Sequence, residues 1–252
     1  MRPYYDYDRP RSSSTWVERL KEPPLSYVLI FLAIAVAVYL VLRVPQYGAR
    51  ILILVIAFPI HELAHAMTAY RLGDSTPRYD GPLTLNPFAH LDLFGSLLIL
   101  TMGLGWAKPV RFNPGALRTD PRIGAMIVAA AGPISNLILA VIIALLWQAL
   151  TPLLPVLNSL ISPNQLANLF FMFVGINIAL FFFNLIPLAP LDGFTVLRGL
   201  LPNQLANQLE RIQPYSVLIF LVLFIFGDRI PIFNWLVWIP ARTVTNLLFG
   251  IL

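Results

Sequence analysis

Long apolar stretches alternate with short polar ones along this sequence, and their lengths predict helices. A helix needs about 20 mostly apolar residues to cross the hydrocarbon of a bilayer. Five runs approach or exceed that length: residues 26–44, 50–72, 124–150, 166–191 and 231–252. Two shorter runs, residues 91–106 and 215–227, are ambiguous. The pattern predicts an all-α membrane protein.

The distribution of basic residues decides how the shorter runs are interpreted. As a helix, residues 91–106 would cover about 24 Å, less than the hydrocarbon thickness of about 30 Å. If this segment dips in and returns while residues 215–227 span, thirteen Lys and Arg lie on one side and three on the other. If residues 91–106 span, the count becomes eight on each side. Because basic residues favour the cytoplasmic side, we predict six spanning helices, one re-entrant segment and cytoplasmic termini.

Composition agrees with this class and excludes others. Of the 252 residues, 58% are hydrophobic and 12% are charged, which favours a membrane protein over a soluble domain. No basic run is interleaved with aromatic residues, so the net charge of +5 does not indicate nucleic-acid binding. The absence of cysteine excludes disulfides and thiolate metal ligands. We expect a polar cytoplasmic segment over residues 1–24 and a single membrane domain over residues 25–252.

Three ionisable residues, His61, Glu62 and His65, lie inside the second apolar run. An ionisable group at membrane depth costs about 2.5 to 3.5 kcal/mol on insertion scales and by default marks a functional site. The two histidines are four residues apart, so one helix face can offer both to a single metal ion. Glu62 lies about 100° further around the helix, which leaves its carboxylate free to take a proton from water.

The alternative without a metal treats both imidazoles as core histidines bonded to neighbouring helices, with Glu62 as their ion partner. Three such groups within five residues of an apolar helix make that arrangement costly. The spacing therefore favours a metal site.

A catalytic zinc ion normally takes three protein ligands, so one must come from outside this helix. Asp192 is the strongest candidate, because Pro187 and Pro190 cannot continue a regular helix and the backbone should open just before the aspartate. Gly193 would allow a turn there. The rival pair, His90 and Asp92, enters the short segment at residues 91–106, while Asp74 and Asp80 are further aspartates nearby.

Together these residues resemble the site-2 protease family of intramembrane zinc metalloproteases, peptidase family M50. The resemblance is carried by the two histidines with their glutamate, and by the downstream motifs Asn184-Leu185-Ile186-Pro187 and Leu191-Asp192-Gly193. It covers about residues 50–200, which we take as the catalytic core. Many relatives carry a PDZ or nucleotide-sensing (CBS) domain; we expect a compact form without either.

The resemblance implies a metalloendopeptidase that cuts within or near the transmembrane segment of another protein, as in regulated intramembrane proteolysis. It implies one Zn²⁺ per chain held by His61, His65 and Asp192, with Glu62 as general base. The expected partners are a transmembrane protein or peptide and the lipid bilayer, with no nucleic acid. The expected location is a bacterial plasma membrane, and the residues indicate no particular oligomeric state.

Substrate binding has two candidates. The helix of a membrane substrate must unwind before cleavage, and the freed backbone groups then need partners. The amides of Asn184 and Asn136 can donate and accept, so either could bind substrate backbone or a developing oxyanion. For Asn136, an ordinary interhelical hydrogen bond is the alternative.

Two other functions remain open from the sequence. A metal transporter could use the pair of His61 and His65 as a transit site, although transport favours ligands on several helices and only one compact cluster exists. A catalytically silent scaffold could bind membrane segments without cutting them, although the intact Glu62 argues against that.

Overall fold

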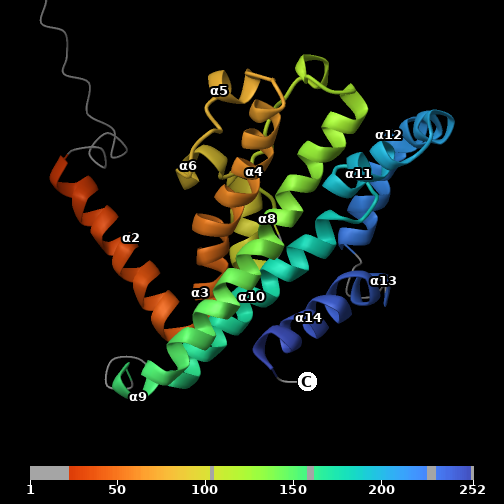
Figure 1. Cartoon of the computed structure of the whole chain (residues 1–252). Helices are drawn as coiled ribbons and strands as arrows, with labels where there is room; N and C mark the ends of the chain where they lie inside the picture. Colours follow the sequence, from red (N-terminus) through yellow and green to blue (C-terminus); the bar gives the residue numbers. More distant parts are fainter. Residues whose placement is uncertain (1–22, 103–104, 158–161, 226–230, 251–252) are drawn as a thin grey trace, which may run out of the picture. The chain divides into compact units, whose positions relative to one another are not determined.

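The computed structural model describes residues 23–102, 105–157, 162–225 and 231–250, and these residues form helices and no strand. The chain divides into two units, residues 1–39 and 40–252. The described part of the first unit is most of the apolar helix α2 (Pro23–Arg43), shown in Figure 1. The predicted cytoplasmic segment therefore lies almost wholly outside the described residues.

The second unit contains all the remaining helices, in three groups along the chain. The first group is α3 (Pro45–Leu52), η1 (Ile53–Ala57), α4 (Phe58–Arg71), α5 (Thr76–Asp80), α6 (Pro87–His90) and α7 (Leu93–Met102). The second group is η2 (Pro114–Ala116), α8 (Pro121–Leu150), η3 (Thr151–Leu153) and α9 (Leu154–Leu157). The third group is α10 (Pro163–Asn184), α11 (Asp192–Leu200), α12 (Asn203–Ile225), α13 (Pro231–Phe233), η5 (Asn234–Trp238) and α14 (Ile239–Phe249).

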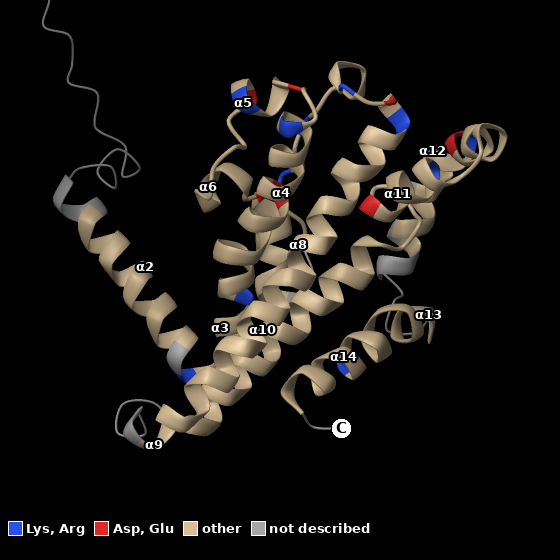
Figure 2. Cartoon of the chain, viewed as in Figure 1, with Lys and Arg blue, Asp and Glu red and all other residues tan. Residues whose placement is uncertain are grey.

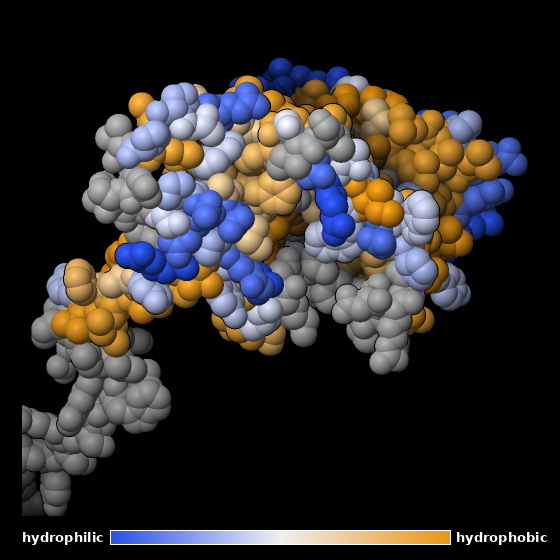
Figure 3. Space-filling model, turned by 90° about the horizontal axis from the view of Figure 1, so that it is seen from below, coloured by the Kyte–Doolittle hydropathy of each residue, from blue (hydrophilic) through white to orange (hydrophobic). Residues whose placement is uncertain are grey.

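Helix α8 is central to this unit, since it packs against α4, α10, α11 and α14 (Figure 1). Its buried face is rich in small residues, which let neighbouring helices approach closely: Gly124, Ala125, Ala129, Gly132, Ala140 and Ala144. Its other face exposes large side chains at helical spacing: Ile127, Ile134, Ile138, Ile142 and Leu145. Lipid, rather than water, suits this exposed apolar face of α8. On the face seen in Figure 3, hydrophobic surface lies beside hydrophilic patches.

Among the residues that the structure describes, three helical segments are long and apolar enough to cross a membrane: Pro45–Arg71, Pro121–Leu153 and Pro163–Asn184. They correspond to three of the runs predicted from the sequence, with shifted ends. The first begins at Pro45 rather than at residue 50, and the third ends at Asn184 rather than at residue 191. Of the other predicted spans, residues 215–227 fall largely within α12.

The first of these segments contains a wider turn just before the histidines. Residues Ile53–Ala57 form a π-helical turn, in which the N–H of Phe58 bonds to the carbonyl of Ile53. Pro59 follows directly; its ring crowds the carbonyl four residues earlier and it has no N–H to donate. The wider turn accommodates the proline without breaking the helix, so the histidines remain on a continuous helical surface.

The two ends of the short segment at residues 91–106 lie close together. Helix α7 begins two residues after Leu91. An isolated antiparallel bridge pairs Leu91 with Ala107. Arg50 donates from Nη1 to the carbonyls of Leu100 (2.7 Å) and Thr101 (3.0 Å), at the end of α7. A guanidinium suits the unpaired carbonyls and the negative end of the helix dipole. These contacts bring the two ends of the segment together, and its re-entrant course in a membrane stays a prediction.

Asp74 fixes the loop that follows α4. Its side chain is 1% exposed. Its Oδ1 accepts from the backbone N–H (2.9 Å) and hydroxyl (2.6 Å) of Thr76, and its Oδ2 accepts from the N–H of Asn113 (2.6 Å). Burial raises the pKa of this carboxyl, but the bonds from Thr76 and Asn113 outweigh burial and lower the pKa below its ordinary value. Asp74 therefore stabilises the fold in its ionised form.

Replacement of Asp74 by Asn is expected to destabilise the protein at neutral pH by about 1.5 to 3 kcal/mol, the range for hydrogen bonds to a charged group. Because the folded pKa is lowered, this stabilisation is present above the unfolded pKa of about 3.9 and is lost as pH falls through the folded value. Thermal unfolding in detergent at a series of pH values measures it. An Asp74→Asn protein with the same acid-side slope as wild type would contradict this account.

Candidate metal centre

One helix carries three of the predicted site residues. Within α4, His61, Glu62 and His65 are 8%, 7% and 8% exposed, so all three polar groups are buried. The two histidines share a face, and their Nε2 atoms lie 3.0 Å apart. Two imidazole nitrogens are thus turned toward one point, as their spacing predicted.

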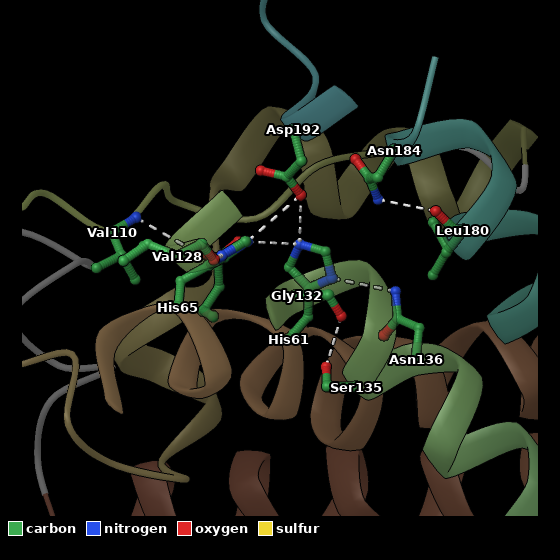
Figure 4. A network of polar contacts seen from close by, with 11 residues as sticks. His61, His65, Val110, Val128, Gly132, Ser135, Asn136, Leu180, Asn184 and Asp192 are labelled. Atoms are coloured by element: carbon green, nitrogen blue, oxygen red, sulfur yellow. Dashed lines mark hydrogen bonds and ion pairs between the residues drawn. The ribbon is translucent and has the colours of Figure 1, made fainter. Parts of the chain in front are cut away.

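Asp192 comes to the same point from a different part of the chain. Helix α10 ends at Asn184, a non-helical segment follows, and Asp192 opens α11. Its Oδ2 lies 3.3 Å from Nε2 of His61 and 3.4 Å from Nε2 of His65 (Figure 4). Among the described residues these three form the group of His, Asp and Glu side chains able to hold a metal ion.

Each imidazole also has a partner on α8, at its other nitrogen. Nδ1 of His65 lies 2.7 Å from the carbonyl oxygen of Val128. Nδ1 of His61 lies 3.1 Å from Nδ2 of Asn136. These contacts orient both rings, as outer partners of metal-binding histidines commonly do.

Glu62 faces the same cavity, which has a volume of about 310 Å³. Its Oε2 accepts from the backbone N–H of Val110 at 3.3 Å, so the non-helical segment after residue 107 holds the carboxylate in place. The cavity also has an apolar lining: Phe58, Trp106, Phe112, Leu180, Phe183 and Phe220. A proton acceptor and the candidate metal ligands therefore share one largely apolar chamber.

The rival ligand candidates are not brought to this cavity. His90 is 1% exposed and its Nε2 lies 2.7 Å from the carbonyl of Thr84, while Asp92 accepts from the N–H of Gly95 at the start of α7. Asp74 is held by the loop after α4, and Asp80 lines a separate cavity with His90. His90 and Asp92 thus make local contacts at the start of the short segment at residues 91–106.

The two predicted substrate-binding asparagines both line the cavity, but each already has a partner. Nδ2 of Asn184 donates to the carbonyl of Leu180 (3.0 Å), and Nδ2 of Asn136 faces His61. The sequence does not reveal the roles of Val110 and Val128, because both act through backbone groups. A backbone contact does not depend on which side chain the residue carries.

Sequence reasoning also missed Gly132 as part of the site. A Cβ at Gly132 would lie 2.3 Å from Nε2 of His65 and 2.6 Å from Nε2 of His61. The absence of a side chain therefore keeps open the space toward which both imidazoles turn. A glycine directly before Pro133 inside an apolar run was the available signal.

The geometry and donor types fit zinc. Two imidazoles and one carboxylate form a donor set that catalytic zinc sites use, with the fourth position open. At Zn–N and Zn–O distances near 2.1 Å, tetrahedral donors lie roughly 3.3 to 3.5 Å apart. The three separations found here, 3.0, 3.3 and 3.4 Å, are close to that spacing.

Replacement of Gly132 by Ala is expected to weaken zinc binding by roughly 10- to 100-fold, the range for groups that position metal ligands. The new methyl group would push both imidazoles away from their common point. Gly175→Ala is the matched control, because a Cβ at Gly175 meets its nearest atom at an ordinary 3.6 Å. Competition with a zinc-binding dye measures the affinity, and equal affinities for the two variants would contradict the steric argument.

Comparison with known proteins points to one family. Residues 49–226 match peptidase family M50. The chain is 38% identical to "Putative zinc metalloprotease YwhC" of Bacillus subtilis, over 75% of this chain and 83% of the relative. It is 31% identical to "Putative zinc metalloprotease Rip2" of Mycolicibacterium smegmatis, over 83% of this chain and 73% of the relative.

No solved structure shows a significant match to the chain. The family match covers more than half of the sequence, and the names of the relatives agree with the predicted metalloprotease and with zinc as its metal. The apolar helices and the family together identify a membrane protein. The resemblance found in the sequence is thereby confirmed, and the chain belongs to peptidase family M50.

Proposed function

We propose that this protein is an intramembrane zinc metalloprotease that hydrolyses a peptide bond within or near the transmembrane segment of a membrane protein. One observation carries the proposal: three metal-ligand side chains and a glutamate line one cavity among apolar helices. His61 and His65 belong to a helix long and apolar enough to span a membrane. A protease site at that depth suits a substrate that is itself in the membrane.

In this proposal, His61, His65 and Asp192 hold Zn²⁺ and Glu62 moves the proton. Zinc, when bound, acts as a Lewis acid that activates water and polarises a peptide carbonyl. The Glu62 carboxylate takes the proton of the attacking water and then delivers it to the leaving amine. The N–H of Val110 holds Oε2 of Glu62 in position for both transfers. No covalent enzyme intermediate is needed.

The cavity supports an unwound apolar peptide as substrate. Its aromatic and aliphatic lining suits apolar side chains, while hydrolysis needs a peptide carbonyl that is free of helical hydrogen bonds. The non-helical segment from Ala107 to Phe112 contributes four residues to the cavity lining: Ala107, Pro109, Val110 and Phe112. Asn184 is retained as a proposed partner for substrate backbone, because it lines the same cavity and lies eight residues before Asp192.

The membrane arrangement that we propose has six spans, cytoplasmic termini and a re-entrant segment at residues 91–106, within a single membrane domain over residues 25–252. Charged residues gather around α5, the start of α8, and α11 with α12 (Figure 2), which supports a cytoplasmic position for that end. His65 lies about 9 Å along the helix from Arg71, close to this end. The bacterial origin of the relatives supports a plasma membrane location.

Reconstitution into liposomes tests the proposed function against its alternatives. A single-span substrate is placed in the same vesicles, and cleavage and zinc entry are measured together. We expect cleavage within or beside the span and no zinc flux. Zinc flux without cleavage would favour a metal transporter, which the family does not favour. Binding of substrate with neither cleavage nor flux would favour a silent scaffold.

A further inference from the structure

Asn136 is the most deeply buried polar side chain that touches the candidate metal centre. It is 1% exposed, and its Nδ2 lies 3.1 Å from Nδ1 of His61 (Figure 4). Its Oδ1 is buried and has no hydrogen-bond partner among the described residues. An unpaired buried carbonyl oxygen costs about 1 to 3 kcal/mol, so this arrangement of the amide needs an explanation.

The binding of one metal ion by both histidines would explain the unpaired oxygen of Asn136. A neutral imidazole carries a single N–H, so a histidine that offers Nε2 to a metal must carry its proton on Nδ1. The Nε2 atoms of His61 and His65 both point to Oδ2 of Asp192. Each Nδ1 therefore needs a hydrogen-bond acceptor when the site is filled.

His65 already has such an acceptor. Its Nδ1 faces the carbonyl of Val128 at 2.7 Å, and a carbonyl oxygen can only accept. His61 differs, because its Nδ1 faces a side-chain amide that can turn and present either NH₂ or oxygen. Oδ1 of that same amide has no partner among the described residues, and the contact of this amide with His61 makes Oδ1 the available acceptor.

Two other buried or half-buried asparagines show where the NH₂ group of a turned Asn136 can bind. Asn177 and Asn184 each donate from Nδ2 to the carbonyl four residues earlier, at 2.8 and 3.0 Å. The residue four before Asn136 is Gly132, whose carbonyl now accepts the hydroxyl of Ser135, a group free to rotate. By analogy with Asn177 and Asn184, a half-turn of the amide would direct the NH₂ group of Asn136 toward this carbonyl and would present Oδ1 to His61.

We infer that Asn136 is a positioning residue whose side-chain oxygen accepts the Nδ1–H of His61 and so holds His61 in the tautomer that binds the metal. The inference rests on the proposed zinc centre. It also assigns Asn136 a role different from the substrate-binding one expected from the sequence. Removal of the acceptor should weaken zinc binding by about 10- to 100-fold, as loss of outer partners of metal ligands does.

Zinc affinity of the full-length protein in detergent tests the inference, with a dye chelator as competitor. Asn136→Leu removes the acceptor, whereas Asn136→Asp keeps an oxygen that can accept. We expect a 10- to 100-fold loss of affinity in the first and near wild-type affinity in the second. Asn177→Leu is the matched control, because Asn177 is 0% exposed, lies in α10 and lines no part of this cavity. Its zinc affinity should be unchanged.

Melting temperatures separate positioning from general structure. In excess chelator, Asn136→Leu should melt no lower than Asn177→Leu, and zinc should raise its melting temperature less than it raises that of the control. If Asn136→Leu does not fold, Asn136→Ala replaces it in the same assay. Unchanged zinc affinity with a raised KM for a peptide would overturn the inference in favour of substrate binding. Failure of wild type itself to bind zinc would instead refute the proposed function.

Discussion

Replacement of Glu62 by Gln is expected to lower the rate of peptide cleavage by about 10² to 10⁴-fold, the usual contribution of a general acid-base group. Gln has nearly the same shape, so the amide should still meet the N–H of Val110, but it cannot take a proton from water. Zinc content should stay at the wild-type level, since Glu62 is not among the three ligand candidates. Single-turnover cleavage in detergent measures the change.

Glu210→Gln provides the matched control for this substitution. Glu210 lies on α12, where it forms an ion pair with Arg198, and it lines no part of the cavity. Its replacement should leave cleavage unchanged. A Glu62→Gln protein that still cleaves at the wild-type rate would remove Glu62 from the reaction.

Replacement of Asp192 by Ala is expected to eliminate both zinc and cleavage. The carboxylate is the only one of the three candidate ligands that comes from outside α4. Without it, two imidazoles from one helix remain, one short of the three protein ligands typical of catalytic zinc. Metal analysis of the purified variant and a cleavage assay on the same sample measure both losses.

Asp92→Ala distinguishes this account from the rival ligand set. Asp92 accepts from the N–H of Gly95 at the start of α7, so its loss should cost only a cap, about 1 kcal/mol. Zinc should stay bound. If Asp192→Ala kept zinc while Asp92→Ala lost it, the metal would have to lie at the pair of His90 and Asp92.

Much of the site could be predicted because local rules determine it. The spacing of His61 and His65 places both on one helix face, whatever surrounds that helix. The break before Asp192 follows from the inability of Pro187 and Pro190 to continue a helix. The structure ends α10 at Asn184, three residues before Pro187, and Ile186, which directly precedes that proline, lies outside the helix.

Other features depend on packing between distant segments and could not be predicted. Gly193 was expected to allow a turn, but it lies inside the first turn of α11, where a Cβ would come within 2.3 Å of the backbone of Leu185. Its small size serves close packing, which corrects the expectation. The contacts from Val128 and Asn136 to the histidines likewise depend on how α8 crosses α4.

The central claim, that zinc at this centre performs the hydrolysis, is tested most directly by following zinc content and cleavage together in one preparation. The purified protein is stripped with a chelator and then titrated with zinc, while cleavage of a single-span membrane substrate is measured at each step. The account predicts that cleavage disappears with the metal and returns in proportion to zinc, reaching its maximum at about one zinc per chain. Full cleavage by zinc-free protein would contradict it.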